Sequence, residues 1–350
     1  MIDLRGLTLS ETENLISSLG EQKYRGKQLF DRIHKGVSDF DEITNISKVL
    51  REKLAEISFL ENMKISEKFV SKLDETAKYL LQLRDGNFVE CVLMKYKHGY
   101  TVCISTQVGC KMGCKFCASS HAEFARNLTA GEMLGQVLLA SREVERLTNG
   151  EVKRVSNVVL MGIGEPLDNF DNVLKFIGLV NSPDGINIGQ RHISLSTCGL
   201  ADKILELAKL NLQITLSVSL HATSDMVRNE IMPINRRFGL DELLQSCREF
   251  AKVTGRRISF EYALIDGIND SKEVANELAR LLKRYFESNL IHLNLIPINY
   301  VKEAGFSRSK RAEAFRAELE RKGVTATLRR ELGADIAAAC GQLRSSVNSE

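Results

Sequence analysis

Strand-like and helix-like stretches alternate along the chain from residue 100 to residue 300. Each strand-like stretch is short, apolar and rich in β-branched residues, and the stretches between them have helical spacing. Strands separated by helices pair in parallel through right-handed crossovers, so we predict an α/β fold. The predicted strands are 100–106, 154–161, 191–197, 212–218, 256–263 and 290–296, and the predicted helices are 130–147, 169–181, 200–210, 240–253 and 272–286.

Three cysteines follow the first predicted strand within eight residues: Cys110, Cys114 and Cys117. Thiolates spaced this closely can all bind one iron–sulfur cluster. Because a [4Fe–4S] cluster has one iron more than this loop has thiols, one iron stays open for a substrate or cofactor. The spacing therefore favours a catalytic cluster.

Two other interpretations of these cysteines are open on spacing alone. A disulfide is disfavoured, because the odd number leaves one thiol over and the chain shows no secretory signal. A structural zinc site is the serious alternative, since His121 follows Cys117 at a spacing that completes a Cys3His set.

Small polar residues follow the other predicted strands, at the edge where parallel strands carry their functional loops. The turn at 162–166 has two glycines but Leu167 where a dinucleotide-binding fingerprint needs a third, so that fingerprint is excluded. Glu165 in this turn can accept an ammonium group. The remaining polar candidates, suited to a ribose or a carboxylate, are Ser196, Ser219, His221 and Asn299.

Length and composition set broad limits on the protein. The 350 residues allow one large domain, or a large and a small one, and the hydrophobic fraction of 43% suits a sizeable core. No apolar run reaches the length of a membrane span, and no signal-peptide pattern opens the chain. Eight cysteines in such a chain indicate a reducing compartment, where thiols serve as ligands or reagents.

The segments on either side of the alternating core predict accessory regions. Residues 1–60 have the pattern of three helices, the first with a capping box at Ser10 and Glu13. Residues 61–99 are β-rich and contain a turn at Asp85-Gly86. Residues 301–350 predict a helix at 308–322, a strand at 324–330 and a tail that contains Cys340.

The net charge of +3 is too small to indicate nucleic-acid binding, but its distribution is uneven. Residues 301–330 contain nine Lys or Arg against four Glu. A second basic region lies in the N-terminal part of the chain. Taken alone, each of the two regions is typical of an ordinary solvated helix face. The cations are Lys23, Arg25, Lys27, Arg32 and Lys35 in the N-terminal region and Lys302, Arg308, Lys310, Arg311, Arg316, Arg321, Lys322, Arg329 and Arg330 near the C-terminus.

Further motifs surround the cysteine loop: residues 105–110 (STQVGC), 161–166 (MGIGEP), 219–222 (SLHA), 232–235 (MPIN) and 335–343 (DIAAACGQL). With Cys110-x3-Cys114-x2-Cys117 they resemble the RlmN/Cfr family of radical S-adenosylmethionine (SAM) methyltransferases over nearly the whole chain. The resemblance implies a partial (β/α)6 radical-SAM barrel at 100–300. It also implies a small helical RNA-binding domain at 1–60, a β-rich linker at 61–99 and a C-terminal extension at 301–350.

The resemblance implies an RNA methyltransferase that modifies carbon 2 of an adenosine in 23S ribosomal RNA and in transfer RNA. Carbon 2 of adenine is electron-poor and bears no acidic proton, so ordinary transfer from a sulfonium is unreasonable and a carbon radical is needed. The implied cofactors are a [4Fe–4S] cluster and two SAM molecules per turnover. A reductant such as flavodoxin, a cytoplasmic location and a monomeric state are also expected.

The resemblance assigns roles to individual residues. It implies that Cys340 accepts a methyl group, that Cys103 then resolves the protein–RNA crosslink by forming a disulfide with Cys340, and that Glu90 removes the carbon-2 proton. Without it, Cys103 is a core residue and Glu90 a strand carboxylate in an apolar run, where burial raises the pKa. The implied cluster ligands are Cys110, Cys114 and Cys117, and the implied SAM-binding residues are Gly164, Glu165, Ser196, Ser219, Leu220, His221 and Asn299.

Two alternatives to this function stay open. The first is a Cfr-like enzyme, which methylates carbon 8 of the same ribosomal adenosine. Cfr-like sequences tend to have Ala and Arg where this chain has Pro166 and Pro297, so the resemblance favours carbon 2. A zinc-stabilised RNA-binding protein without catalysis is the alternative from a different class.

Overall fold

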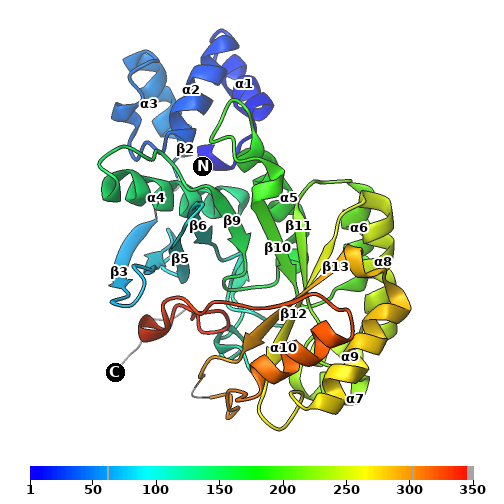
Figure 1. The fold of residues 1–350 in the computed structure, drawn as a ribbon. Coiled ribbons are helices and arrows are strands. Elements are labelled where there is room, and N and C mark those ends of the chain that lie inside the picture. Colours follow the sequence, from blue (N-terminus) through cyan, green and yellow to red (C-terminus); the bar gives the residue numbers. More distant parts are fainter. Residues whose placement is uncertain (61–62, 302, 345–350) are drawn as a thin grey trace.

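A ten-stranded sheet forms the centre of the computed structural model, which describes residues 1–60, 63–301 and 303–344 (Figure 1). The strand order is β14-β13-β12-β11-β10-β9-β6-β5-β4-β3. One side of the sheet is parallel and the other antiparallel, and the two meet at β6. The predicted α/β fold is confirmed.

The parallel part contains the six strands predicted between residues 100 and 296 and the strand predicted at 324–330. It consists of β6 (Gly99–Cys103), β9 (Asn157–Leu160), β10 (Ile193–Thr197), β11 (Thr215–Ser219), β12 (Ile258–Leu264), β13 (Ile291–Pro297) and β14 (Ala326–Leu328). The first strand ends at Cys103, earlier than predicted, because the backbone N–H groups of Thr106 and Gln107 turn away to the carbonyl of Ile163. This turn leads directly into the cysteine loop.

Helices cover the parallel strands and enclose the main hydrophobic core. The predicted helices are confirmed as α4 (Ala130–Leu147), α5 (Phe170–Asn181), α6 (Ala201–Lys209), α8 (Leu240–Thr254), α9 (Lys272–Tyr285) and α10 (Ala312–Arg321). Figure 1 shows α6, α8 and α9 along the same outer side of the strands. A short helix that the sequence analysis did not predict, α7 (Asp225–Ile231), begins at Ser224, whose side chain accepts from the backbone N–H of Val227.

Three antiparallel strands extend the sheet beyond β6: β5 (Phe88–Tyr96), β4 (Ala77–Gln82) and β3 (Lys64–Val70). The predicted turn between β4 and β5 is present, with Gly86 at a φ of +87°. The predicted β-rich segment thus belongs to the same sheet as the barrel strands.

The N-terminal region is a three-helix unit with its own small hydrophobic cluster. Its helices are α1 (Leu9–Ser18), α2 (Tyr24–His34) and α3 (Lys48–Ile57), and β1 (Ile2–Asp3) pairs with β2 (Ser58–Phe59) at its base. The capping box predicted at Ser10 and Glu13 is wrong. Thr8 and Glu11 form it, because α1 begins at Leu9 and places Ser10 and Glu13 inside the helix.

The C-terminal segment crosses back over the antiparallel part of the sheet (red in Figure 1). The backbone N–H of Gly333 donates to the Asp74 carboxylate at 2.9 Å, and Asp335 accepts from the backbone N–H of Lys72 at 2.9 Å. After the short 3-10 turn Ala334–Ile336, residues 337–344 lie against β5 and the cysteine loop. Within the described ranges, no helix has the length and apolar character that a membrane span requires.

Candidate active site

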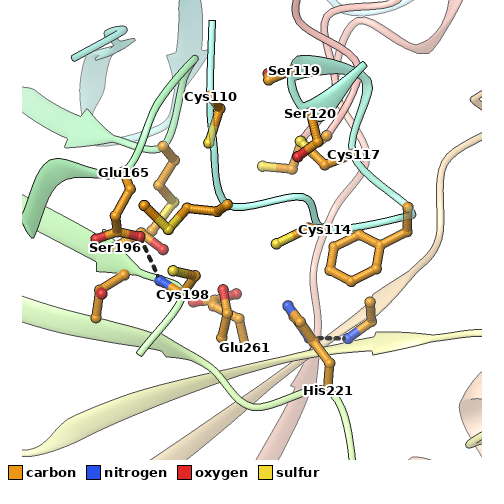
Figure 2. A pocket seen from close by; sticks show the side chains of 18 of the residues that line it. Cys110, Cys114, Cys117, Ser119, Ser120, Glu165, Ser196, Cys198, His221 and Glu261 are labelled. Atoms are coloured by element: carbon orange, nitrogen blue, oxygen red, sulfur yellow. Dashed lines mark hydrogen bonds between the residues drawn. The ribbon is translucent and has the colours of Figure 1, made fainter. Parts of the chain in front are cut away.

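A cavity lies at the carboxyl ends of the parallel strands (Figure 2). All three loop cysteines line it, together with Cys340 from the tail and polar residues at, or just after, the carboxyl ends of β9, β10, β11 and β13. The predicted site residues that line it are Cys110, Cys114, Cys117, Gly164, Glu165, Ser196, Ser219, His221, Asn299 and Cys340. The fold therefore brings together groups that are up to 230 residues apart, from Cys110 to Cys340.

The backbone of the cysteine loop is fixed by glycines. Gly109 has a φ of +73°, and a Cβ at this position would lie 2.1 Å from the carbonyl oxygen of Glu123. Gly113 has a φ of +72° beside Pro233. Only glycine adopts such angles without strain, and at 109 only glycine fits. The backbone N–H of Lys115 also donates to the carbonyl of Ile231 at 3.0 Å, which ties the loop to the end of α7.

The chemistry of the three thiols fits an iron–sulfur cluster. Their sulfur atoms face a shared space in Figure 2. Burial raises the pKa of Cys110 to about 12 and raises the pKa values of Cys114 and Cys117 above that of an exposed thiol. Thiolates in such surroundings need a cationic partner, and iron supplies one.

The same geometry does not favour zinc. Among the described residues, no group of three or more His, Cys, Asp or Glu side chains converges on one ion position. His121, the proposed fourth zinc ligand, is exposed at the end of a short 3-10 turn. A cluster suits thiols that do not converge, because each thiolate binds a different iron.

Glu165 is a buried carboxylate at the wall of the cavity. Its two oxygens accept from the backbone N–H of Leu167 at 3.0 Å and of Cys198 at 2.7 Å, the second of which Figure 2 shows. Burial raises the pKa of Glu165, and these two N–H donors oppose that effect. An ammonium group of a ligand would stabilise the charged form further.

His221 is neutral and fixed. Its Nδ1 accepts from the backbone N–H of Ala263 at 2.9 Å, and its ring lies edge-on to Phe116 with centroids 4.9 Å apart. Burial lowers the pKa of His221 to about 3. Since Nδ1 is an acceptor, the neutral ring has its proton on Nε2 and can donate it into the cavity.

Two other predicted SAM-binding residues differ in their placement. The Leu220 side chain is fully buried in the main core, so this residue can face a ligand only through its neighbours Ser219 and His221. Asn299 lines the cavity, and its Nδ2 donates to the carbonyl of Cys340 at 3.0 Å. Asn299 therefore also positions the tail.

Cys340 lines a second, adjoining cavity together with Cys103. All eight cysteines are free thiols, so the structure does not contain the disulfide that the resemblance implies. Burial is the largest cause that raises the pKa of Cys103 to about 12. The two sulfurs that the sequence analysis paired thus face one space.

Glu90 lies on β5 under the tail. Its carboxylate accepts from the backbone N–H of Arg344 at 2.8 Å and pairs with the Lys78 ammonium at 3.0 Å. Burial raises the pKa of Glu90, with Lys78 the largest opposing influence. This environment agrees with the raised pKa that the apolar run predicted.

The sequence analysis missed two charged residues of the cavity. Glu261 lies on the fully buried strand β12, where a carboxylate inside an apolar run was a usable signal. Arg329, which the sequence analysis grouped with the surface cations, lies in the wall of both cavities. Its guanidinium is 3.5 Å from Glu261 and 3.4 Å from the Met161 sulfur. The neighbouring Cys340 side chain is the largest influence that raises the pKa of Arg329.

The cations in and next to α2 are mostly engaged by acidic residues. The pairs are Lys23 with Glu13, Arg25 with Glu21, Lys27 with Asp184 and Lys35 with Asp31. Near the C-terminus Arg308 pairs with Glu331 and Arg316 with Glu313 and Glu320, while Lys302 lies outside the described residues. The structure therefore adds no support for phosphate contacts at α2.

Two family models match separate parts of the chain. Residues 104–279 match the model of the radical SAM superfamily, and residues 2–60 match the ribosomal RNA large subunit methyltransferase N-terminal domain. The first match begins one residue after β6 ends and includes the cysteine loop.

Relatives of known name and structure extend this match. A protein of Caldanaerobacter subterraneus subsp. tengcongensis, named probable dual-specificity RNA methyltransferase RlmN, is 51% identical over 98% of both chains. One of the same name from Alkaliphilus metalliredigens is 49% identical over 98% of this chain and 95% of its own.

Among solved structures, a radical SAM methyltransferase from Sphaerobacter thermophilus is 40% identical, with a TM-score of 0.93 over 99% of this chain and all of its own. The cofactors expected from the sequence, a [4Fe–4S] cluster and SAM, are those of the radical SAM superfamily. The chain belongs to the radical SAM superfamily and, within it, to the RlmN family.

Proposed function

We propose that this protein methylates carbon 2 of an adenosine in 23S ribosomal RNA and in transfer RNA by radical SAM chemistry. The observation that carries the proposal is the presence of the Cys340 sulfur in the cavity lined by the three loop cysteines. The names of the relatives and the match of residues 2–60 support RNA as the substrate class.

The cavity residues are assigned to SAM as follows. Cys110, Cys114 and Cys117 hold the cluster, which when bound supplies the electron that cleaves SAM to methionine and a 5′-deoxyadenosyl radical. Glu165 takes the ammonium group, because its buried carboxylate needs a cation. Gly164, Ser196, Ser219, Asn299 and the Nε2–H of His221 provide hydrogen bonds to the remaining polar atoms, and Leu220 fixes the backbone between its two neighbours.

Cys340 acts first as a nucleophile. Its sulfur takes the methyl group from one SAM, so that a sulfonium C–S bond breaks, a thioether bond forms and the thiol proton is released. The radical from a second SAM removes a hydrogen atom from this methyl group, and the resulting methylene radical adds to carbon 2 of the adenine. The adduct must then give up one electron, and the oxidised cluster held by the three loop cysteines would accept it.

Glu90 and Cys103 complete the transfer. Glu90 takes the carbon-2 proton. The Cys103 thiol then loses its proton as its sulfur attacks the Cys340 sulfur. The disulfide forms, the bond between the Cys340 sulfur and the methylene carbon breaks, and this carbon takes a proton to become the product methyl group. A reductant such as flavodoxin restores both thiols and supplies the cluster electron.

The RNA substrate must bring its adenine out of the base stack to reach this cavity. We assign residues 1–60 and the basic C-terminal region to RNA contact, with affinity that falls steeply with salt. A cytoplasmic location and a monomeric state complete the proposal.

The test is turnover of anaerobically purified protein with transcripts of both RNAs, followed by mass spectrometry of the nucleosides. We expect 2-methyladenosine. Appearance of 8-methyladenosine would instead establish the Cfr-like reaction, and one zinc per chain without iron or sulfide would establish the non-catalytic alternative.

Cys340→Ser tests the key residue. The variant should still cleave SAM but form no methylated RNA, because an alcohol does not replace the thiol as acceptor. Cys247→Ser is the matched control, since Cys247 is a buried thiol in the core beside α6. Full turnover by Cys340→Ser would refute the proposed role.

A further inference from the structure

Lys78 is a buried cation that the mechanism above does not use. It lies on β4 with a side chain that is 10% exposed, and the Glu90 side chain on β5 is 8% exposed. A lysine this deeply buried is unusual unless a partner compensates its charge. Lys78 has such a partner in Glu90, at 3.0 Å.

The register of the sheet places Lys78 among the residues assigned to chemistry. Lys78 lies opposite Val92, and Val92 lies opposite Cys103 on β6. Glu90 is two residues from Val92 on β5, so its side chain is on the same face of the sheet. One face therefore carries Lys78, Glu90 and Cys103 in neighbouring positions, and the tail packs on it through Ala338 and Leu343.

The Lys78 ammonium has three neighbours that fix its position. Besides Glu90, it donates to the backbone carbonyl of Ala337 at 3.3 Å and lies 5.1 Å from the centre of the Phe69 ring. Ala337 is three residues before Cys340. A single charged group thus links the carboxylate to the tail that carries the methyl acceptor.

Other charged or titratable groups near Glu90 do not replace Lys78. Arg344 donates to Glu90 through its backbone N–H, while its guanidinium is held by both oxygens of Glu303 at 2.8 Å. Cys91 is the next residue on β5, and burial raises the pKa of its thiol, so it brings no positive charge. Among the described ion pairs, the one that involves the Glu90 carboxylate is its pair with the Lys78 ammonium.

We propose that Lys78 is a positioning residue for the carbon-2 proton transfer: its ammonium keeps the Glu90 carboxylate charged and oriented beneath the Cys340 tail. This inference rests on the proposed function, in which Glu90 is the base. In that step the carbon-2 hydrogen passes as a proton to a Glu90 oxygen, and its bonding electron pair stays on the adenine ring. Only a charged carboxylate can accept that proton.

The consequence is a defined pH dependence. Burial raises the pKa of Glu90 and Lys78 lowers it, so removal of the ammonium raises it further. The fraction of charged Glu90 then falls at neutral pH and is recovered at higher pH. A loss of structure alone does not shift the pH dependence of a reaction in this direction.

The experiment compares Lys78→Met, Lys78→Arg and Glu90→Gln with the wild-type protein in single-turnover reactions with transfer RNA between pH 6.5 and 9. Three products are followed: methylated Cys340 by peptide mass, the covalent protein–RNA crosslink on denaturing gels, and methylated adenosine. Thermal melting of each variant reports folding independently of turnover.

We expect Lys78→Met to form methyl-Cys340 within about threefold of the wild-type rate, to accumulate the crosslink and to release product about tenfold more slowly at pH 7. This release should approach the wild-type rate near pH 9. Lys78→Arg should restore release to within about threefold at pH 7, because it retains the charge.

The outcomes separate the inference from the proposed function. Suppose that Glu90→Gln accumulates the crosslink while Lys78→Met has a wild-type pH profile. This result would leave the role of Glu90 intact and overturn the role of Lys78. An equal loss at every pH in Lys78→Met and Lys78→Arg would also overturn it. If Glu90→Gln releases product at the wild-type rate, the assignment of Glu90 as the base fails first. If Lys78→Met does not fold, the pH profile of Lys78→Arg decides, and it should lie within half a pH unit of the wild type.

Discussion

The cysteine loop and the C-terminal tail both bring sulfur to one cavity, but they are held there in different ways. The loop is fixed by its own backbone, through the positive φ angles of Gly109 and Gly113. The tail is fixed by partners far away in the sequence: Asn299 binds the carbonyl of Cys340, and Ser119 binds the carbonyl of Leu343 at 2.9 Å. The loop geometry is therefore set mainly by its own backbone, with a long-range bond from Lys115 to Ile231, whereas the tail geometry depends on contacts with the rest of the fold.

This difference suits the two proposed tasks. A cluster needs three thiols in a constant arrangement, and short-range backbone constraints provide it. Cys340 must react in turn with SAM, RNA and Cys103. Contacts that are individually worth about 1 kcal/mol hold such a segment without making it rigid.

The strongest test of this comparison is one glycine substitution in each region. Gly109→Ala places a Cβ 2.1 Å from the Glu123 carbonyl oxygen and puts alanine at a left-handed φ angle. Because the steric overlap and the backbone strain both distort the loop, we expect the iron content after anaerobic reconstitution to fall by about tenfold or more. Gly341→Ala has a similar φ of +82°, but its Cβ would lie 3.6 Å from the nearest atom, the Phe116 carbonyl oxygen.

Gly341→Ala should therefore keep its iron and slow the methylation of Cys340 by about fivefold, the effect of roughly 1 kcal/mol of strain. Iron analysis and peptide mass measure the two effects. Equal iron loss in both variants would show that the tail, too, is needed to build the cluster site.

Arg329 offers a second test, because it lies in the wall of both cavities that Cys340 lines. Arg329→Met removes the cation beside Cys340 from the cavity wall, and we expect methyl transfer to Cys340 to slow by about tenfold while iron content is unchanged. Arg329→Lys should retain part of the rate. A wild-type rate in Arg329→Met would mean that the guanidinium serves only to pair with Glu261.

The smallest expected effect concerns the last described anchor of the tail. Glu303→Gln weakens the ion pair with Arg344, in which each side chain is about one-third exposed. Because such an exposed pair holds the tail only weakly, we expect the alkylation of Cys340 by a maleimide to accelerate by about twofold. Glu313→Gln removes a similar surface pair on α10 and should leave the rate unchanged. Acceleration by tenfold would identify this pair as the main latch of the tail.

Sequence patterns predicted the regular elements and the local motifs well. The helix at 130–147 matches α4 at both ends, because its Thr129–Glu132 capping box fixes the start. The cysteine loop was predicted from spacing alone, since its geometry is set within a few residues. The Glu90 environment followed from the apolar residues beside it.

Features that depend on tertiary contacts were not predictable in the same way. The charge on Arg329 resembled those of its exposed neighbours, and only the crossing of the tail reveals that it lies in the cavity wall. The sequence pattern of the cations around α2 indicated an ordinary solvated helix face, but it could not identify all their partners, since Asp184, which pairs with Lys27, lies more than 150 residues away. Lys78 gave no signal at all, because its partners come from two other strands, β3 and β5, and from the tail.

One bond at the junction of loop and tail has a wider consequence. The backbone N–H of Ala118, next to Cys117, donates to the backbone carbonyl of Gly341, next to Cys340, at 2.7 Å. Neither partner is a side chain, so ordinary substitutions at either position leave the bond available, and only a proline at 118 deletes the donor. The spacing between cluster and methyl acceptor can thus persist while the surrounding sequence diverges.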